Sequence, residues 1–108
     1  MYKQGLVPFP FSDHLTTTKQ RPAVIISKDS LNHNRYIVAK ITSVLGKSNH
    51  ALPIFKKDID FELHKASQIN TDEIFTLTES LIIKKIGAFR RDALERLVDV
   101  VKDNFEIE

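Results

Sequence analysis

Two side chains at the ends of apolar runs have the chemistry to hold a phosphate group. Arg21 stands directly before the β-branched run at residues 22–27, and Thr42 lies near the end of a second such run at residues 36–43. A guanidinium binds phosphate through two parallel hydrogen bonds, and a threonine hydroxyl adds a neutral donor and acceptor. Placed together, the two side chains would form a site for a phosphate ester.

The register of two strands decides whether Arg21 and Thr42 meet. Residues 22–27 and 36–43 predict consecutive antiparallel strands, joined by a polar loop at residues 28–35. If Ser27 pairs with Tyr36, Arg21 stands opposite Thr42, and directly opposed residues share a face within about 5.5 Å at Cβ. A slip by one residue would place one of the two side chains on the opposite face of the sheet. The alternative interpretation is therefore that Arg21 and Thr42 are solvated residues at the sheet edge.

A third candidate lies between the first two apolar runs. Residues 12–20 are polar and lack an apolar period, which predicts an exposed, mobile loop. His14 lies in this loop, and imidazole is the side chain that most readily exchanges a proton near neutral pH. His14 is therefore a candidate for acid/base help, with a solvated loop residue as the alternative.

The remaining apolar runs predict a mainly β protein. Residues 6–11 form a predicted edge strand, because Pro8 and Pro10 have no N–H to donate. Shorter strands are predicted at residues 50–55, 61–63, 67–69 and 74–78. Many short strands at this spacing indicate a small β-barrel.

The period changes towards the C-terminus, where the sequence predicts one amphipathic helix. Gly87 is predicted to break the chain before it, with Asp92 as the N-cap and Glu95 in the capping-box position. The apolar positions recur with a helical period; they are Leu94, Leu97, Val98, Val101 and Phe105. This stripe is expected to pack on the barrel.

Composition limits the class of protein. The 108 residues, 42% of them hydrophobic, suit one domain spanning residues 1–108. The absence of cysteine and the scattered histidines predict a cytoplasmic protein with no disulfide, metal or cofactor. No run reaches the roughly 20 apolar residues of a membrane span. The formal net charge of +2 permits a polyanionic partner without requiring one.

Several segments together resemble the MazF/PemK-type toxin family. The resemblance is carried by residues 6–13 (LVPFPFSD), 19–27 (KQRPAVIIS), 41–43 (ITS), 67–77 (SQINTDEIFTL) and 86–87 (IG). It implies an SH3-like β-barrel with a C-terminal helix, a homodimer, and a sequence-specific endoribonuclease of a toxin–antitoxin system. Its partners would be single-stranded RNA, cleaved without metal by 2′-hydroxyl attack, and a cognate antitoxin protein.

The resemblance also assigns roles to individual residues. Arg21 and Thr42 match the family's catalytic arginine and threonine, the pair that the register brings together. His14, Ser43 and Asp72 would assist acid/base chemistry or position the substrate. The residues expected to contact RNA are Phe11, Asp13, Lys19, Gln20, Lys40 and Asn70.

Two features depart from the family, and the first of them favours a different function on the same fold. Gly5 runs directly into Leu6, which shortens the first strand relative to the family, and Asn70 stands where one branch of the family has a catalytic arginine. The alternative is a non-catalytic nucleic-acid-binding module or a gyrase-targeting module like CcdB. Three basic pairs either follow an RNA backbone or are solvated; they are at residues 56–57, 84–85 and 90–91.

Overall fold

The computed structural model describes residues 2–8, 11–12, 20–46 and 48–108. The strands are β1 (Leu6–Pro8), β2 (Phe11–Ser12), β3 (Gln20–Arg21), β4 (Ala23–Ile25), β5 (Arg35–Thr42), β6 (Ala51–Pro53), β7 (Gln68–Thr78) and β8 (Lys85–Ala88). Three 3-10 helices are η1 (Asp29–Leu31), η2 (Lys56–Asp58) and η3 (Glu79–Leu81), and α1 is Arg91–Asp103. None of the helices in these ranges is long and apolar enough to cross a membrane.

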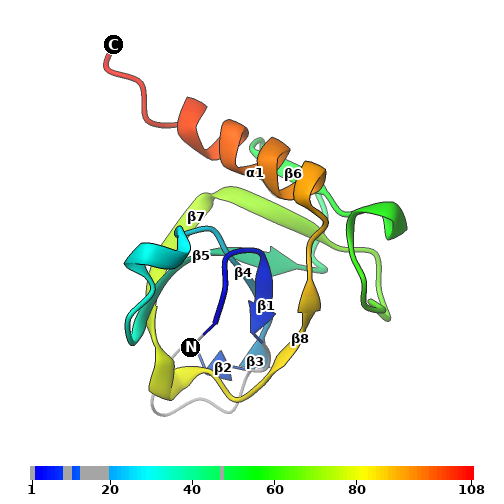
Figure 1. Cartoon of the computed structure of the whole chain (residues 1–108). Helices are drawn as coiled ribbons and strands as arrows, with labels where there is room; N and C mark the ends of the chain where they lie inside the picture. Colours follow the sequence, from blue (N-terminus) through cyan, green and yellow to red (C-terminus); the bar gives the residue numbers. More distant parts are fainter. Residues whose placement is uncertain (1, 9–10, 13–19, 47) are drawn as a thin grey trace.

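The fold is mainly β with one C-terminal helix, as predicted. The described strands form three antiparallel sheets, with the orders β1-β8, β2-β3 and β4-β5-β7-β6. Figure 1 shows the strands curling around a common interior while α1 lies across the outside of the sheet. The arrangement is barrel-like, but the described sheets are not joined into one closed barrel.

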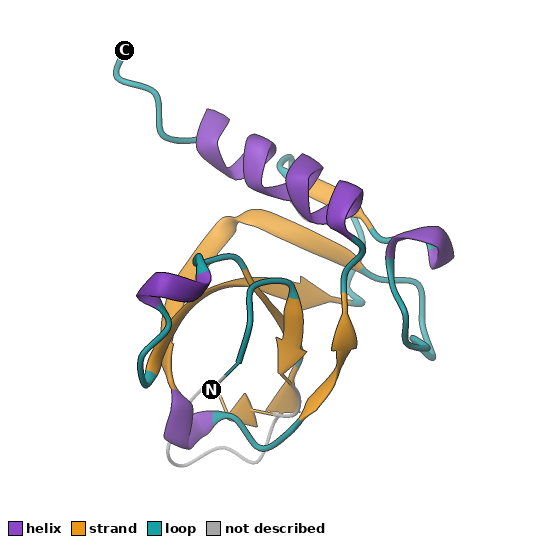
Figure 2. Cartoon of the chain, in the orientation of Figure 1, coloured by secondary structure: helices purple, strands orange, loops and turns teal. Residues whose placement is uncertain are grey.

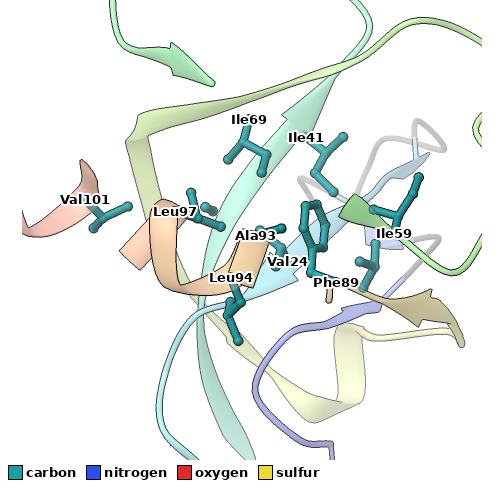
Figure 3. Close-up of a cluster of buried hydrophobic side chains, with 11 residues drawn as sticks. Val24, Ile41, Ile59, Ile69, Phe89, Ala93, Leu94, Leu97 and Val101 are labelled. Carbon is teal, nitrogen blue, oxygen red and sulfur yellow. The ribbon is translucent and has the colours of Figure 1, made fainter. Parts of the chain in front are cut away.

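Alternating side chains on β4 and β5 give the central sheet two apolar faces. Ile25 and Val38 point to the barrel interior, where Tyr36 and Leu77 are also buried. Val24 and Ile41 point the other way. This outer core fills the space between the sheet and α1 (Figure 3); its buried members are Val7, Val24, Ala39, Ile41, Ile59, Ile69, Phe89, Ala93, Leu94, Leu97 and Val101.

The predicted helix is present, but its ends differ from the prediction. α1 begins at Arg91 with Arg90 at the N-cap, and no side chain caps it. Asp92 lies in the first turn, where its carboxylate is 3.6 Å from Arg96 Nη1. Phe105 lies beyond the helix and is 71% exposed, so it does not continue the packed stripe. The expectations for Asp92 as N-cap and for Phe105 as a packed residue were therefore wrong.

Two of the predicted strands form one continuous strand in the structure, and a third is absent. Residues 67–69 and 74–78 belong to a single strand, β7, which stays paired with β5 through a register shift opposite Ala39 and Lys40. Asn70 and Thr71, within the polar interruption, are buried there and hydrogen-bonded. Residues 61–63 form a loop rather than a strand (Figure 2). Residues 50–55 contain β6, and the predicted loop at 28–35 contains η1.

Gly87 lies inside β8 and does not break the chain. It pairs with Val7 of β1. A Cβ atom at this position would lie 2.6 Å from Phe61 Cδ1 and 2.7 Å from Asp60 Oδ1. Glycine is therefore required because β8 and residues 60–61 approach each other so closely.

Candidate active site

The register predicted for the first strand pair is confirmed. β4 and β5 pair with Ala23 opposite Lys40, and Ile25 opposite Val38. The Ile41 N–H donates a hydrogen bond of 3.2 Å to the Pro22 carbonyl, so the same register continues one residue beyond β4. The next residues in this register are Arg21 and Thr42, which therefore share the face that carries Ala23 and Val38.

Arg21 and Thr42 line one pocket of about 590 Å³. Thr42 is buried, at 8% exposure, and Arg21 is half-buried. The Val44 N–H donates a hydrogen bond of 3.1 Å to Thr42 Oγ1, which holds the hydroxyl in one orientation. A fixed hydroxyl and a cation that line the same pocket are suited to holding a phosphate ester.

The rest of the pocket lining comes from other parts of the sequence. Residues 61–65 and Ser67 contribute one part, and Lys84 and Ile86 contribute the other. Arg21, Lys65 and Lys84 bring positive charge, against one lining carboxylate, Glu62. The described lining is therefore net positive, and it also contains apolar surface; the apolar members are Pro22, Ile41, Val44, Phe61, Leu63 and Ile86.

The segment at residues 58–65, part of which lines the pocket, is hydrogen-bonded to β8 and α1. The Asp60 N–H donates to the Ala88 carbonyl at 3.2 Å, and the Ala88 N–H donates to Asp60 Oδ1 at 2.7 Å. The buried carboxylate of Asp58 accepts hydrogen bonds from Arg96 Nη2 at 2.8 Å and from the Phe55 N–H at 3.1 Å. These contacts at residues 58–60 therefore position the lining residues 61–65 that follow in the sequence.

A row of polar side chains continues from Thr42 along the same face of the sheet. Gln68 stands opposite Thr42, and its amide donates to Asn70 Oδ1 at 3.0 Å. The Asn70 amide donates to Glu73 at 2.9 Å, and Glu73 lies 3.2 Å from Lys40 Nζ. The polar groups of Lys40 and Asn70 are thus engaged within the protein, and neither side chain lines the pocket.

The other predicted site residues fall into three groups. Ser43 is exposed and lines the pocket, whereas Asp72 is exposed but does not line it and accepts a bond of 3.4 Å from Ser48 Oγ. The backbones of Phe11 and Gln20 belong to β2 and β3, with Phe11 opposite Arg21. The remaining three lie outside the described residues; they are Asp13, His14 and Lys19.

His64 and Lys65 line the pocket, although neither was predicted to be a site residue. They lie in a loop with no apolar period, so no local pattern marks them. For the basic pair at residues 84–85 the structure distinguishes the members, because Lys84 lines the pocket and Lys85 does not. The sequence shows the basic pair but does not distinguish Lys84 from Lys85.

Comparisons with known proteins identify a family and a fold. The profile of the family described as PemK-like, MazF-like toxin of type II toxin–antitoxin systems matches residues 6–105. A comparison with curated protein sequences found no match.

Three solved structures illustrate the similarity of fold. An endoribonuclease in complex with its cognate antitoxin, from a mycobacterial species, has a TM-score of 0.77 at 12% identity, with 100% of each chain covered. The Mycobacterium tuberculosis toxin MazF-mt6 has a TM-score of 0.73 at 17% identity, covering 95% of this chain and 98% of that one. The MazE-MazF structure from Deinococcus radiodurans has a TM-score of 0.72 at 14% identity, covering 98% and 95%.

Proposed function

Because the chain belongs to the family of PemK-like, MazF-like toxins of type II toxin–antitoxin systems, we propose that it is a sequence-specific endoribonuclease that cleaves single-stranded RNA without a metal ion. The observation that carries this proposal is the pairing of Arg21 and Thr42 on one net-positive pocket. The two residues that the resemblance assigns to catalysis are the two that the strand register brings to the same place.

In the proposed reaction, the ribose 2′-oxygen attacks the adjacent phosphorus and the bond to the 5′-oxygen breaks. The products are a 2′,3′-cyclic phosphate and a 5′-hydroxyl. Arg21 stabilises the negative charge of the pentacoordinate phosphate, since a guanidinium is a strong donor but a poor proton shuttle. Thr42, held by Val44, orients the phosphate and the 2′-hydroxyl.

The protons need a separate carrier in this mechanism. The 2′-hydroxyl must lose a proton, and the leaving 5′-oxygen must gain one. We assign this acid/base help to His14. Ser43, which lines the pocket, would contact the RNA, and Asp72 would position it from the neighbouring β7.

The proposal extends to partners and location. A cognate antitoxin would bind this protein and block the pocket, as in a two-component toxin system. The similar mycobacterial structure contains its cognate antitoxin, which supports this part of the proposal. We further propose that the protein forms a homodimer and acts in the cytoplasm, where its RNA substrate is found.

Cleavage of a mixed-sequence RNA in EDTA tests the proposal. The wild-type protein should give discrete fragments ending in a cyclic phosphate or a 3′-phosphate. Arg21→Ala and Thr42→Ala should each lose about 10²-fold or more in rate, the magnitude typical of removing one preorganised transition-state donor. Arg21→Lys should also be impaired, because lysine keeps the charge but cannot form the two parallel hydrogen bonds of the guanidinium. Thr42→Ser is the matched control that keeps the hydroxyl.

Two results would contradict the proposed mechanism. A requirement for magnesium would show that the protein side chains alone do not activate the phosphate. Unaltered cleavage by Arg21→Ala would remove Arg21 from the site. RNA that stays intact but binds tightly would instead support the non-catalytic binding module, which the short first strand, Leu6–Pro8, favours.

A further inference from the structure

The pocket that Arg21 and Thr42 line also carries two ammonium groups from separate segments. Lys65 lies in the loop after η2, and Lys84 lies directly before β8. Both residues are exposed. Two segments far apart in sequence therefore contribute the same type of charge to one surface.

These two ammonium groups are available to a ligand. Neither forms an ion pair with a carboxylate in residues 2–8, 11–12, 20–46 or 48–108. Lys40 provides the contrast, since its ammonium lies 3.2 Å from Glu73 and is neutralised there. The carboxylate of Glu62 lines the same pocket and reduces the positive charge without cancelling it.

The pocket that carries these charges also exposes apolar side chains. Phe61, Leu63 and Ile86 line the pocket together with Lys65 and Lys84. The Phe61 ring is fixed by an edge contact with Phe89, with centroids 6.3 Å apart. A single-stranded nucleic acid offers unpaired bases for apolar contact and a phosphate at every nucleotide for the cations, so its chemistry matches both parts of the surface.

We propose that Lys65 and Lys84 form a second phosphate subsite, in which each ammonium contacts a backbone phosphate next to the one that Arg21 and Thr42 engage. The proposal rests on the endoribonuclease function proposed above and concerns the same pocket. The pocket volume of about 590 Å³ lies within the range of roughly 300–1,000 Å³ for small-ligand sites. The subsite would contribute binding of the RNA backbone without reading its sequence.

Salt-dependent binding tests the subsite apart from catalysis. The probe is a short, mixed-sequence single-stranded RNA with 2′-O-methyl groups, which lacks the attacking hydroxyl. Fluorescence anisotropy gives the Kd at several salt concentrations for the wild type, Lys65→Gln and Lys84→Gln. Matched controls are Lys85→Gln, the neighbour of Lys84 that does not line the pocket, and Lys57→Gln, whose ammonium lies 5.9 Å from the centre of the Phe55 ring.

Each pocket lysine should account for one phosphate contact. Lys65→Gln and Lys84→Gln should raise Kd and reduce the slope of log K against log salt by about 0.7 each, the value for single strands. The two control variants should keep the wild-type slope, and Glu62→Gln should bind more tightly. Any of three results would overturn the subsite. These are unchanged slopes for both pocket variants, equal losses of slope in the control variants, and a wild type that does not bind the probe.

Cleavage of unmodified RNA separates the two proposals. Intact RNA together with lysine-dependent binding would refute the endoribonuclease and keep the subsite. Cleavage together with unchanged slopes would refute the subsite alone.

Discussion

Replacing Gly87 by alanine should destabilise the protein by introducing an atom where there is no space for it. The new Cβ would lie 2.6 Å from Phe61 Cδ1, 2.8 Å from Phe61 Cβ and 2.7 Å from Asp60 Oδ1. The Phe61 Cβ cannot rotate away, because only the backbone can move it. Relief therefore requires β8 and residues 60–61 to separate, which also strains the hydrogen bond from the Ala88 N–H to Asp60.

The expected cost follows from these contacts. Overpacking of this kind costs about 1–3 kcal/mol, and the exposed hydrogen bond adds about 0.5–1.5 kcal/mol. The smaller backbone entropy of an unfolded chain with alanine offsets about 0.4–1 kcal/mol. The free energy of unfolding should therefore fall by about 0.5–4 kcal/mol in total.

Urea unfolding followed by far-ultraviolet circular dichroism measures this change, since the chain has no tryptophan to report it. Gly46→Ala is the control: its φ of +80° is unfavourable for alanine, but among the described residues beyond its chain neighbours no atom lies within 4 Å of the new Cβ. This control should lose about 1 kcal/mol from backbone strain alone. A loss below about 0.5 kcal/mol for Gly87→Ala would refute the close approach, because that is the range of neutral surface changes.

Two further substitutions test the contacts around the core. Asp58→Asn should lower the free energy of unfolding by about 1–3 kcal/mol, because it weakens the charge-assisted bond between the buried Asp58 carboxylate and Arg96. Glu95→Gln, which removes the exposed pair with Arg91, should change it by less than about 0.5 kcal/mol. Equal effects of the two variants in urea unfolding would contradict a stabilising role for the Asp58–Arg96 bond. Burial, with the hydrogen bond to Glu79, raises the pKa of the Tyr36 hydroxyl, so the neutral form is favoured in the folded protein. This contribution is full below the ordinary value of about 10 and is lost as pH rises through the folded-state pKa. Tyr36→Phe should cost about 1–2 kcal/mol at neutral pH and weaken the alkaline loss of stability, which urea titrations across pH would detect; an unchanged alkaline profile would exclude Tyr36 as its source.

The elements that the sequence predicted well are those whose signal is local. The β-branched runs at residues 22–27 and 36–43 predicted both strands, and the polar loop between them predicted that the two strands pair with each other. The periodic positions from Leu94 to Val101 gave the body of α1. In each case the side-chain period matched the backbone period, so burial on one face followed directly.

The errors occurred where distant contacts outweighed the local pattern. Polar residues 70–73 suggested a gap, yet β7 continues because partners such as Glu73 and the His50 carbonyl satisfy the buried polar groups. Gly87 suggested a break, yet it serves a close approach of two segments. The apolar residues Phe61 and Leu63 suggested a strand, yet they pack from a loop.

The candidate site divides in the same way between sequence and tertiary structure. The apolar patterns of the two runs by themselves determined that they form neighbouring strands, and the structure selects the one register, among those the sequence left open, that puts Arg21 opposite Thr42. Only the tertiary structure decided which residues share the pocket with them, since Lys65 and Lys84 come from separate segments and neither segment's local pattern predicts that the two lie together. Local periodicity encodes which side chains are buried, whereas the pairing of distant surfaces depends on how the whole chain packs.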